Sequence, residues 1–246
     1  NHVSNLLDTW LQRDDGRRTQ QSIAAMAGTP AVFGPGLPAA VQALGHVAQE
    51  VRENQTRPPQ RREELARCCL NAAGSLIDAG IANTTAPEGY HRWASFLAGC
   101  PQVELRDPAR AVELAEKAVR LAPKVATFRQ TLGLADYRAG NWRQALDALE
   151  AANRQQLDGD CATWSLLARA HWQLGLEEEA RAWHAKAVER IKQTRRFSSL
   201  HRLYATESAR LLGLAPPAIP EKGPTEDPDC RPLAEPPEPV SHSHHP

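Results

Sequence analysis

Two stretches of the chain decide its fold: residues 132–152, LGLADYRAGNWRQALDALEAA, and residues 167–187, LARAHWQLGLEEEARAWHAKA. Each begins with Leu and a small residue, carries a Gly eight residues later and continues with regularly spaced Ala. The corresponding positions are all 35 residues apart: Leu132 and Leu167, Gly133 and Ala168, Gly140 and Gly175, Ala145 and Ala180, Leu149 and His184, and Ala152 and Ala187. A pair of helices with its two turns occupies about this length, so the sequence predicts two copies of one helical hairpin.

Small side chains recur where the two helices of a pair must approach closely. Gly133 and Ala168 fall on the first helix of each predicted pair, and Ala145 and Ala180 fall on the second. A larger side chain at these positions would hold the helices apart. We therefore predict a repeat-packing set that consists of Leu132, Gly133, Ala145, Ala152, Trp164, Leu167, Ala168, Ala180 and Ala187.

Helical patterns extend to both sides of these two units. Apolar residues at steps of three and four predict helices over residues 38–54 and 60–79, with Gly80 as the stop of the second. Asp107 followed by Pro108 is typical of a helix start. A capping helix is expected over residues 198–212, because stacked units leave an open apolar end. In it Leu200, Leu203, Tyr204, Leu211 and Leu212 are expected to cover the last repeat, and His201, Arg202, Glu207 and Arg210 to face water.

These patterns divide the chain into four segments. We interpret residues 1–36 as an irregular segment that ends an upstream domain, since the chain starts at Asn1 and its single Met is Met26. Residues 37–89 are helical and form either a divergent repeat or an adjacent helix pair. Residues 90–214 form the repeat domain. Residues 215–246 are rich in Pro and lack apolar periodicity, so we expect a disordered tail.

Composition points to the same fold class. Hydrophobic residues make up 41% of the 246 residues and aromatic residues only 5%, which favours an all-α fold of stacked antiparallel helix pairs, a solenoid. The chain carries 29 basic and 29 acidic residues, so its net charge is zero. A general electrostatic attraction to nucleic acid or to anionic lipid is therefore not expected. Apolar runs are too short for a membrane-spanning helix.

The cysteines indicate a reducing compartment. The chain has five, an odd number, and contains no Cys-x-x-Cys. A disulfide framework needs an even set in a short secreted chain, so we interpret the cysteines as small buried hydrophobic residues and place the protein in the cytoplasm.

The repeat stretches resemble the tetratricopeptide repeat. Residues 163–168, TWSLLA, are similar to the opening of its first helix, and residues 141–146, NWRQAL, to the start of its second. Asp136 and His171 stand where the repeat usually has Tyr. Together with RDPARAVELAEKAVRLAP over residues 106–123, these stretches look like a bacterial subtype that is often found C-terminal to Ser/Thr kinase or WD-repeat domains. The resemblance implies a surface for protein or peptide binding.

Sequence motifs that carry chemistry are missing. The chain contains no phosphate-binding Gly-rich loop of the Walker or dinucleotide type, no His-Glu-x-x-His and no Gly-x-Ser-x-Gly. We therefore expect no enzyme activity, no catalytic residues, no metal and no cofactor.

The predicted function is a non-catalytic scaffold. In the tetratricopeptide arrangement the first helix of each pair lines a concave groove, and this register assigns Gln130, Tyr137, Arg138, Ser165, Arg169, Trp172 and Gln173 to it. Arg and aromatic residues are the usual anchors of interfaces, so the expected ligand is a protein or peptide. The alternative is a regulatory or dimerising C-terminal segment of a larger bacterial signalling enzyme such as a Ser/Thr kinase, with self-association of the chain.

Overall fold

The computed structural model describes residues 37–53, 58–156, 159–193 and 199–217. This part of the chain contains helices and no strand. The helices are α3 (Leu37–Glu53), α4 (Pro59–Ala82), α5 (Pro87–Gly99), α6 (Pro108–Leu121), α7 (Ala126–Ala139), α8 (Trp142–Gln155), α9 (Cys161–Gln173), α10 (Glu177–Gln193) and α11 (Ser199–Leu211), with a short 3-10 helix, η1 (Val103–Leu105), after α5. The all-α prediction is confirmed. The predictions for residues 1–36 and for the tail beyond residue 217 lie outside the described residues.

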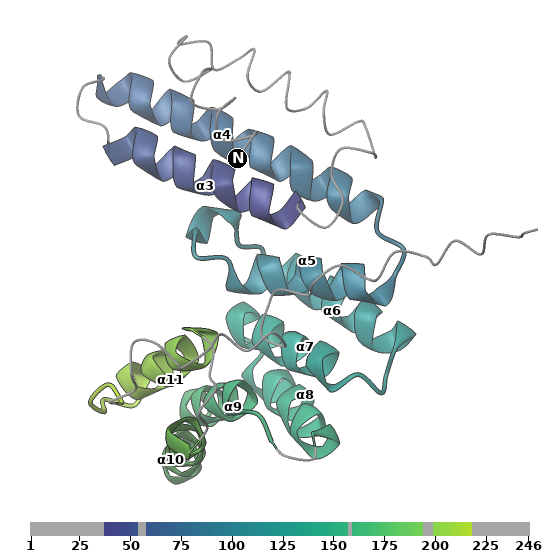
Figure 1. Cartoon of the computed structure of the whole chain (residues 1–246), viewed down its shortest axis with the longest axis vertical. Coiled ribbons are helices and arrows are strands. Elements are labelled where there is room, and N and C mark those ends of the chain that lie inside the picture. The colour runs from purple at the N-terminus through teal and green to yellow at the C-terminus, as the bar shows by residue number, and fades with distance from the viewer. Residues whose placement is uncertain (1–36, 54–57, 157–158, 194–198, 218–246) are drawn as a thin grey trace, which may run out of the picture.

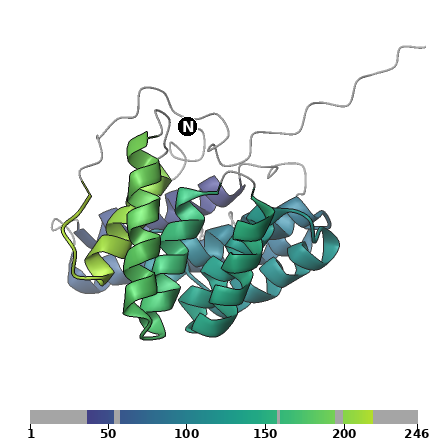
Figure 2. The same ribbon diagram turned by 90° about the horizontal axis from the view of Figure 1, so that it is seen from below.

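The helices stack as successive pairs (Figure 1). The pairs are α3 with α4, α5 with α6, α7 with α8, and α9 with α10, and α11 follows the last of them. The first helices of neighbouring pairs also touch, since α7 contacts both α5 and α9. The result is a solenoid-like stack that ends with α10 and α11 (Figure 2).

The 35-residue offset in the sequence equals the distance along the chain between corresponding helices of the last two pairs. The helices α7 and α9 begin at Ala126 and Cys161, and α8 and α10 begin at Trp142 and Glu177. Both pairs turn at a glycine with positive φ: 83° at Gly140 and 77° at Gly175. Only glycine adopts this left-handed conformation without a steric cost, which explains why both turns carry one.

The small residues lie where α7 and α8 meet. A Cβ atom on Gly133 would lie 2.5 Å from Cγ of Leu149 and 3.2 Å from the carbonyl oxygen of Ala145. Most of the repeat-packing set is buried: Gly133, Ala145, Ala152, Trp164, Leu167, Ala168, Ala180 and Ala187. Leu132 is half-buried against the core.

The helix α4 is longer than predicted. Gly80 does not stop it, because the helix continues to Ala82 and ends at Asn83. A Cβ atom on Gly80 would collide with the indole ring of Trp93 and would lie 2.8 Å from Cδ2 of Leu37. This glycine is therefore a point of close contact between helices and not a helix end.

The long turn between α5 and α6, which contains η1, packs against α3 and so joins the first helix pair to the rest of the stack. Gly45 of α3 leaves room for η1, since a Cβ atom there would lie 2.8 Å from Cδ1 of Leu105 and 2.9 Å from Cγ of Gln102. Arg52 of α3 forms a salt bridge of 2.7 Å with Glu104. One core cluster accordingly includes residues of every pair, from Leu37 of α3 to Ala187 of α10. No helix of the described residues is long and apolar enough to cross a membrane.

Candidate functional site

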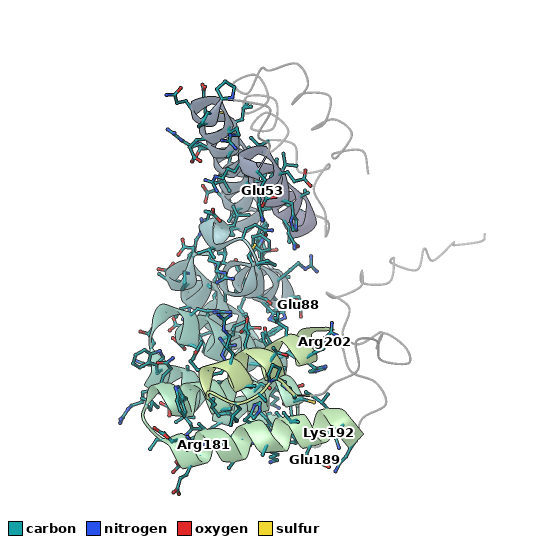
Figure 3. All side chains as sticks on the ribbon, turned by 90° about the vertical axis from the view of Figure 1, so that its left-hand side faces the viewer. Glu53, Glu88, Arg181, Glu189, Lys192 and Arg202 are labelled. Carbon is teal, nitrogen blue, oxygen red and sulfur yellow. The ribbon has the colours of Figure 1, made fainter. Side chains whose placement is uncertain are left out.

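The helix α9 is covered along nearly its whole length. Each of the eleven residues from Cys161 to His171 is buried. A helix in the last pair of a solenoid leaves one face to solvent, so the burial of α9 on all sides needs a further cover. The cover is α11, which packs on α9 and, less extensively, on α10. Figure 3 looks onto this face, where α11 runs antiparallel to α10, with Arg202 and Lys192 at the same side.

The buried face of α11 differs from the predicted one. It consists of Tyr204, Ala205, Ser208, Ala209 and Leu212. Leu203, which was predicted to cover the last repeat, is 50% exposed. Small residues at Ala205, Ser208 and Ala209 allow the backbone of α11 to come close to α9, and larger side chains would prevent this approach. Side chains of Ser199 and Leu200 lie outside the described residues.

A cluster of charges joins α11 to the first helices of two pairs. Nη1 of Arg169 on α9 donates a hydrogen bond of 2.7 Å to Oε2 of Glu207 on α11. Nη2 of Arg138 on α7 lies 3.7 Å from the same oxygen. The guanidinium of Arg169 also lies 4.5 Å from the centre of the Tyr137 ring. Glu207, which was predicted to face water, is only partly exposed, and the two arginines converge on its carboxylate.

The environment of these arginines is largely dry. Arg169 is 4% exposed. Burial and the neighbouring charge of Arg169 lower the pKa of Arg138. The two guanidinium groups repel each other. The carboxylate of Glu207 offsets both this repulsion and the cost of removing the arginine charges from water. The two guanidinium groups are placed to bind one carboxylate, and the aromatic ring of Tyr137 lies beside them.

A second set of polar contacts lies at the start of α9. The Asp160 side chain caps the helix, because its Oδ2 accepts hydrogen bonds of 2.8 Å from the Thr163 amide and 2.9 Å from the Thr163 hydroxyl. The same oxygen accepts a bond of 2.6 Å from Nε2 of Gln130. Oδ1 lies 3.3 Å from Nε2 of His201 on α11. Burial raises the pKa of Asp160, but the contacts with His201 and Thr163 outweigh it and the pKa falls below its usual value.

Near the middle of α11 lies a third polar contact. Nδ1 of His184 on α10 lies 2.8 Å from Oγ of Ser208, and both residues are buried. The Ser208 hydroxyl donates to the carbonyl oxygen of Ala205, so its oxygen accepts from His184. Burial lowers the pKa of His184.

The predicted groove residues therefore fall into two groups. Ser165 and Arg169 are buried under α11, and Gln130 is engaged with Asp160. Trp172 and Gln173, at the other end of α9, are half-exposed. Trp172 lies 5.6 Å from the guanidinium of Arg181 on α10. Arg138 and Arg169, which the sequence assigned to an open groove, converge instead on Glu207 of the chain's own α11.

The sequence did not assign Asp160 to this site and placed His201 and Glu207 on the water-facing side of the capping helix, whereas Tyr204 is buried as predicted. The partner of Glu207 had no signal, because Arg169 is 38 residues away in the sequence.

Comparison with models of protein families finds no match, and neither does comparison with curated proteins. The resemblance to the tetratricopeptide repeat therefore stays a prediction.

Proposed function

We propose that the protein is a non-catalytic scaffold of the tetratricopeptide type that binds an acidic helical segment of a partner protein. The observation that carries the proposal is the convergence of Arg138 and Arg169 on one carboxylate of a helix, that of Glu207. In this structure the bound helix belongs to the same chain. A partner helix with a carboxylate at the equivalent position would replace α11.

The chemistry of the pocket supports this class of ligand. Arg169 holds the carboxylate by a hydrogen bond and Arg138 attracts it by charge, while the ring of Tyr137 packs against the Arg169 guanidinium. The rest of the contact needs small residues on the incoming helix, as Ala205 and Ala209 show. The ligand is therefore an amphipathic helix with a narrow small-residue face and a central Glu or Asp. We place the protein in the cytoplasm, since Cys68, Cys69 and Cys100 are free thiols.

The experiment uses a labelled peptide of residues 199–214, SLHRLYATESARLLGL, as the probe. The host is the full chain with Glu207→Lys, in which the chain's own α11 is repelled by both arginines. We expect this host to bind the peptide in fluorescence anisotropy more tightly than the unchanged chain, where α11 competes at high effective concentration.

Two controls make the result specific. The matched peptide with Glu207→Lys is expected to bind the same host at least about tenfold more weakly, because it meets the arginines with a like charge. Adding Arg169→Ala to the host is expected to remove the difference between the two peptides. Equal binding of both peptides to the Glu207→Lys host, or no binding of either, would contradict the proposal.

The same contact supports a second candidate, self-association. A helix that covers the last pair of a stack can dock on a second copy instead of its own, which gives an exchanged dimer. This reading corresponds to a regulatory or dimerising segment of a larger enzyme. Light scattering after size-exclusion chromatography distinguishes the two: exchange predicts a dimer whose fraction rises with protein concentration, and a scaffold predicts a monomer.

A further inference from the structure

Three metal-ligating side chains meet where α11 crosses the start of α9. They are Asp160, which caps α9, Cys161, the first residue of α9, and His201 from α11. One ligand atom from each, a carboxylate oxygen, a thiol sulfur and an imidazole nitrogen, lie within 4.8 Å of one another. This site is separate from the arginine cluster and uses none of its groups.

The distances fit a small tetrahedral ion. Oδ1 of Asp160 and Nε2 of His201 are 3.3 Å apart. Two ligands at about 2.0 Å from a tetrahedral zinc ion are about 3.3 Å apart. The three ligand atoms lie within 4.8 Å of one another. A sulfur at about 2.3 Å from a tetrahedral zinc ion lies about 3.5 Å from the other ligand atoms, so binding requires the site to close by about 1 Å, and water takes the fourth position.

The carboxylate is already oriented for this role. Its other oxygen, Oδ2, accepts hydrogen bonds from the amide and hydroxyl of Thr163 and from the amide of Gln130. These three donors hold the Asp160 carboxylate so that Oδ1 points to His201. Supporting hydrogen bonds of this kind orient the ligands of metal sites and increase their affinity.

The charges also balance. The positive end of the α9 dipole disfavours a cation, so the negative charges of the ligands must offset both the ion and the dipole. On binding, the sulfur bonds to the ion and its proton leaves to solvent. The carboxylate of Asp160 and the thiolate of Cys161 then neutralise the two positive charges of the ion. Thiolate and imidazole together favour zinc over magnesium or calcium, which prefer oxygen ligands.

We propose that Asp160, Cys161 and His201 bind a zinc ion that fastens α11 to the start of α9. The side chains of Asp160 and His201 are 23% and 15% exposed, so an ion reaches the site from solvent. Its ligands come from the start of α9 and from α11, and Asp160 and His201 are 41 residues apart in the sequence. The ion therefore stabilises the docked state of α11 and makes the arginine cluster harder for a partner helix to reach.

The test is a titration of the full chain with Co²⁺, which replaces zinc and reports a thiolate ligand by its near-ultraviolet charge-transfer absorption. His242, His244 and His245 near the C-terminus offer an unrelated place for metal ions, so the background carries His242→Ala, His244→Ala and His245→Ala. We expect one equivalent of Co²⁺ to produce the band, zinc to displace it, and zinc to raise the melting temperature.

Three variants decide between this site and binding elsewhere. Cys161→Ser is expected to remove the charge-transfer band, and His201→Asn is expected to weaken binding at least about tenfold. Cys68→Ser, at a half-exposed cysteine of α4, is the matched control and should leave both readouts unchanged. Circular dichroism verifies that each variant is folded, and His201→Asn keeps the test valid where Cys161→Ser reduces stability. The proposal is overturned if no band forms in the background chain, or if the band persists in Cys161→Ser.

Discussion

The substitution Glu207→Gln tests how strongly the arginine cluster holds α11. It keeps the size of the side chain and removes its charge. Arg169 then keeps a neutral acceptor, while Arg138 and Arg169 repel each other without a counter-charge. Arg169 is 4% exposed. Removing one partner of a fully buried ion pair costs about 3–5 kcal/mol.

Two features of the structure reduce this cost. The side chain of Glu207 is 34% exposed, so solvent screens part of the interaction. The amide oxygen of Gln also still accepts a hydrogen bond from Arg169. We therefore expect a loss of about 2 kcal/mol in the free energy of unfolding, which lowers the melting temperature by about 4–8 °C in a chain of this size.

The assay is urea denaturation of the full chain followed by circular dichroism. Glu113→Gln on α6 is the control, since this carboxylate is exposed, and it should change the free energy of unfolding by less than about 0.5 kcal/mol. The double substitution Glu207→Gln with Arg169→Met gives the coupling between the two groups, expected at about 1.5 kcal/mol or more. A coupling near zero, or equal effects of Glu207→Gln and Glu113→Gln, would refute the account of α11 docking.

Two further predictions concern the stack itself. Ala145→Leu is expected to destabilise the chain by about 1–3 kcal/mol in the same urea assay. The reason is the close contact of α7 with α8, where the Ala145 carbonyl oxygen lies only 3.2 Å from the position of a Cβ atom on Gly133. A variant as stable as the parent would show that this contact tolerates a larger side chain. The second concerns pH: burial, with a smaller effect of the Arg92 charge, lowers the pKa of His91 from 6.5 to about 4. The unfolded chain therefore binds a proton at His91 that the folded chain excludes, so stability falls as pH drops from about 6.5 to 4, by up to about 3 kcal/mol. His91→Gln should reduce this slope relative to the parent, and identical slopes would show that His91 takes up its proton equally in both states.

The fold class and the repeat could be predicted because their signals are local. Helical spacing and turn glycines depend on residues within one or two turns of each other, and the 35-residue offset between Gly140 and Gly175 is seen by aligning one unit with the next. The proximity of Arg138 and Arg169 could also be predicted from the sequence, since both lie on first helices in neighbouring pairs. The role of Gly80 was not, because a glycine near a predicted helix end has the same local pattern whether it stops the helix or makes room for a ring such as that of Trp93.

The sequence by itself determined the all-α fold, the 35-residue unit and the positions where small residues bring helices together. Only the tertiary structure decided which helix covers α9, because the face that α11 buries depends on the shape and charge of residues far away in the chain. The apolar side chain of Leu203 predicted that this residue is buried. The close approach of the α9 and α11 backbones instead buries the small residues Ala205 and Ala209. Glu207 looks like a surface residue in the sequence, and it is a partner of Arg169 only because the fold brings a buried positive charge to it.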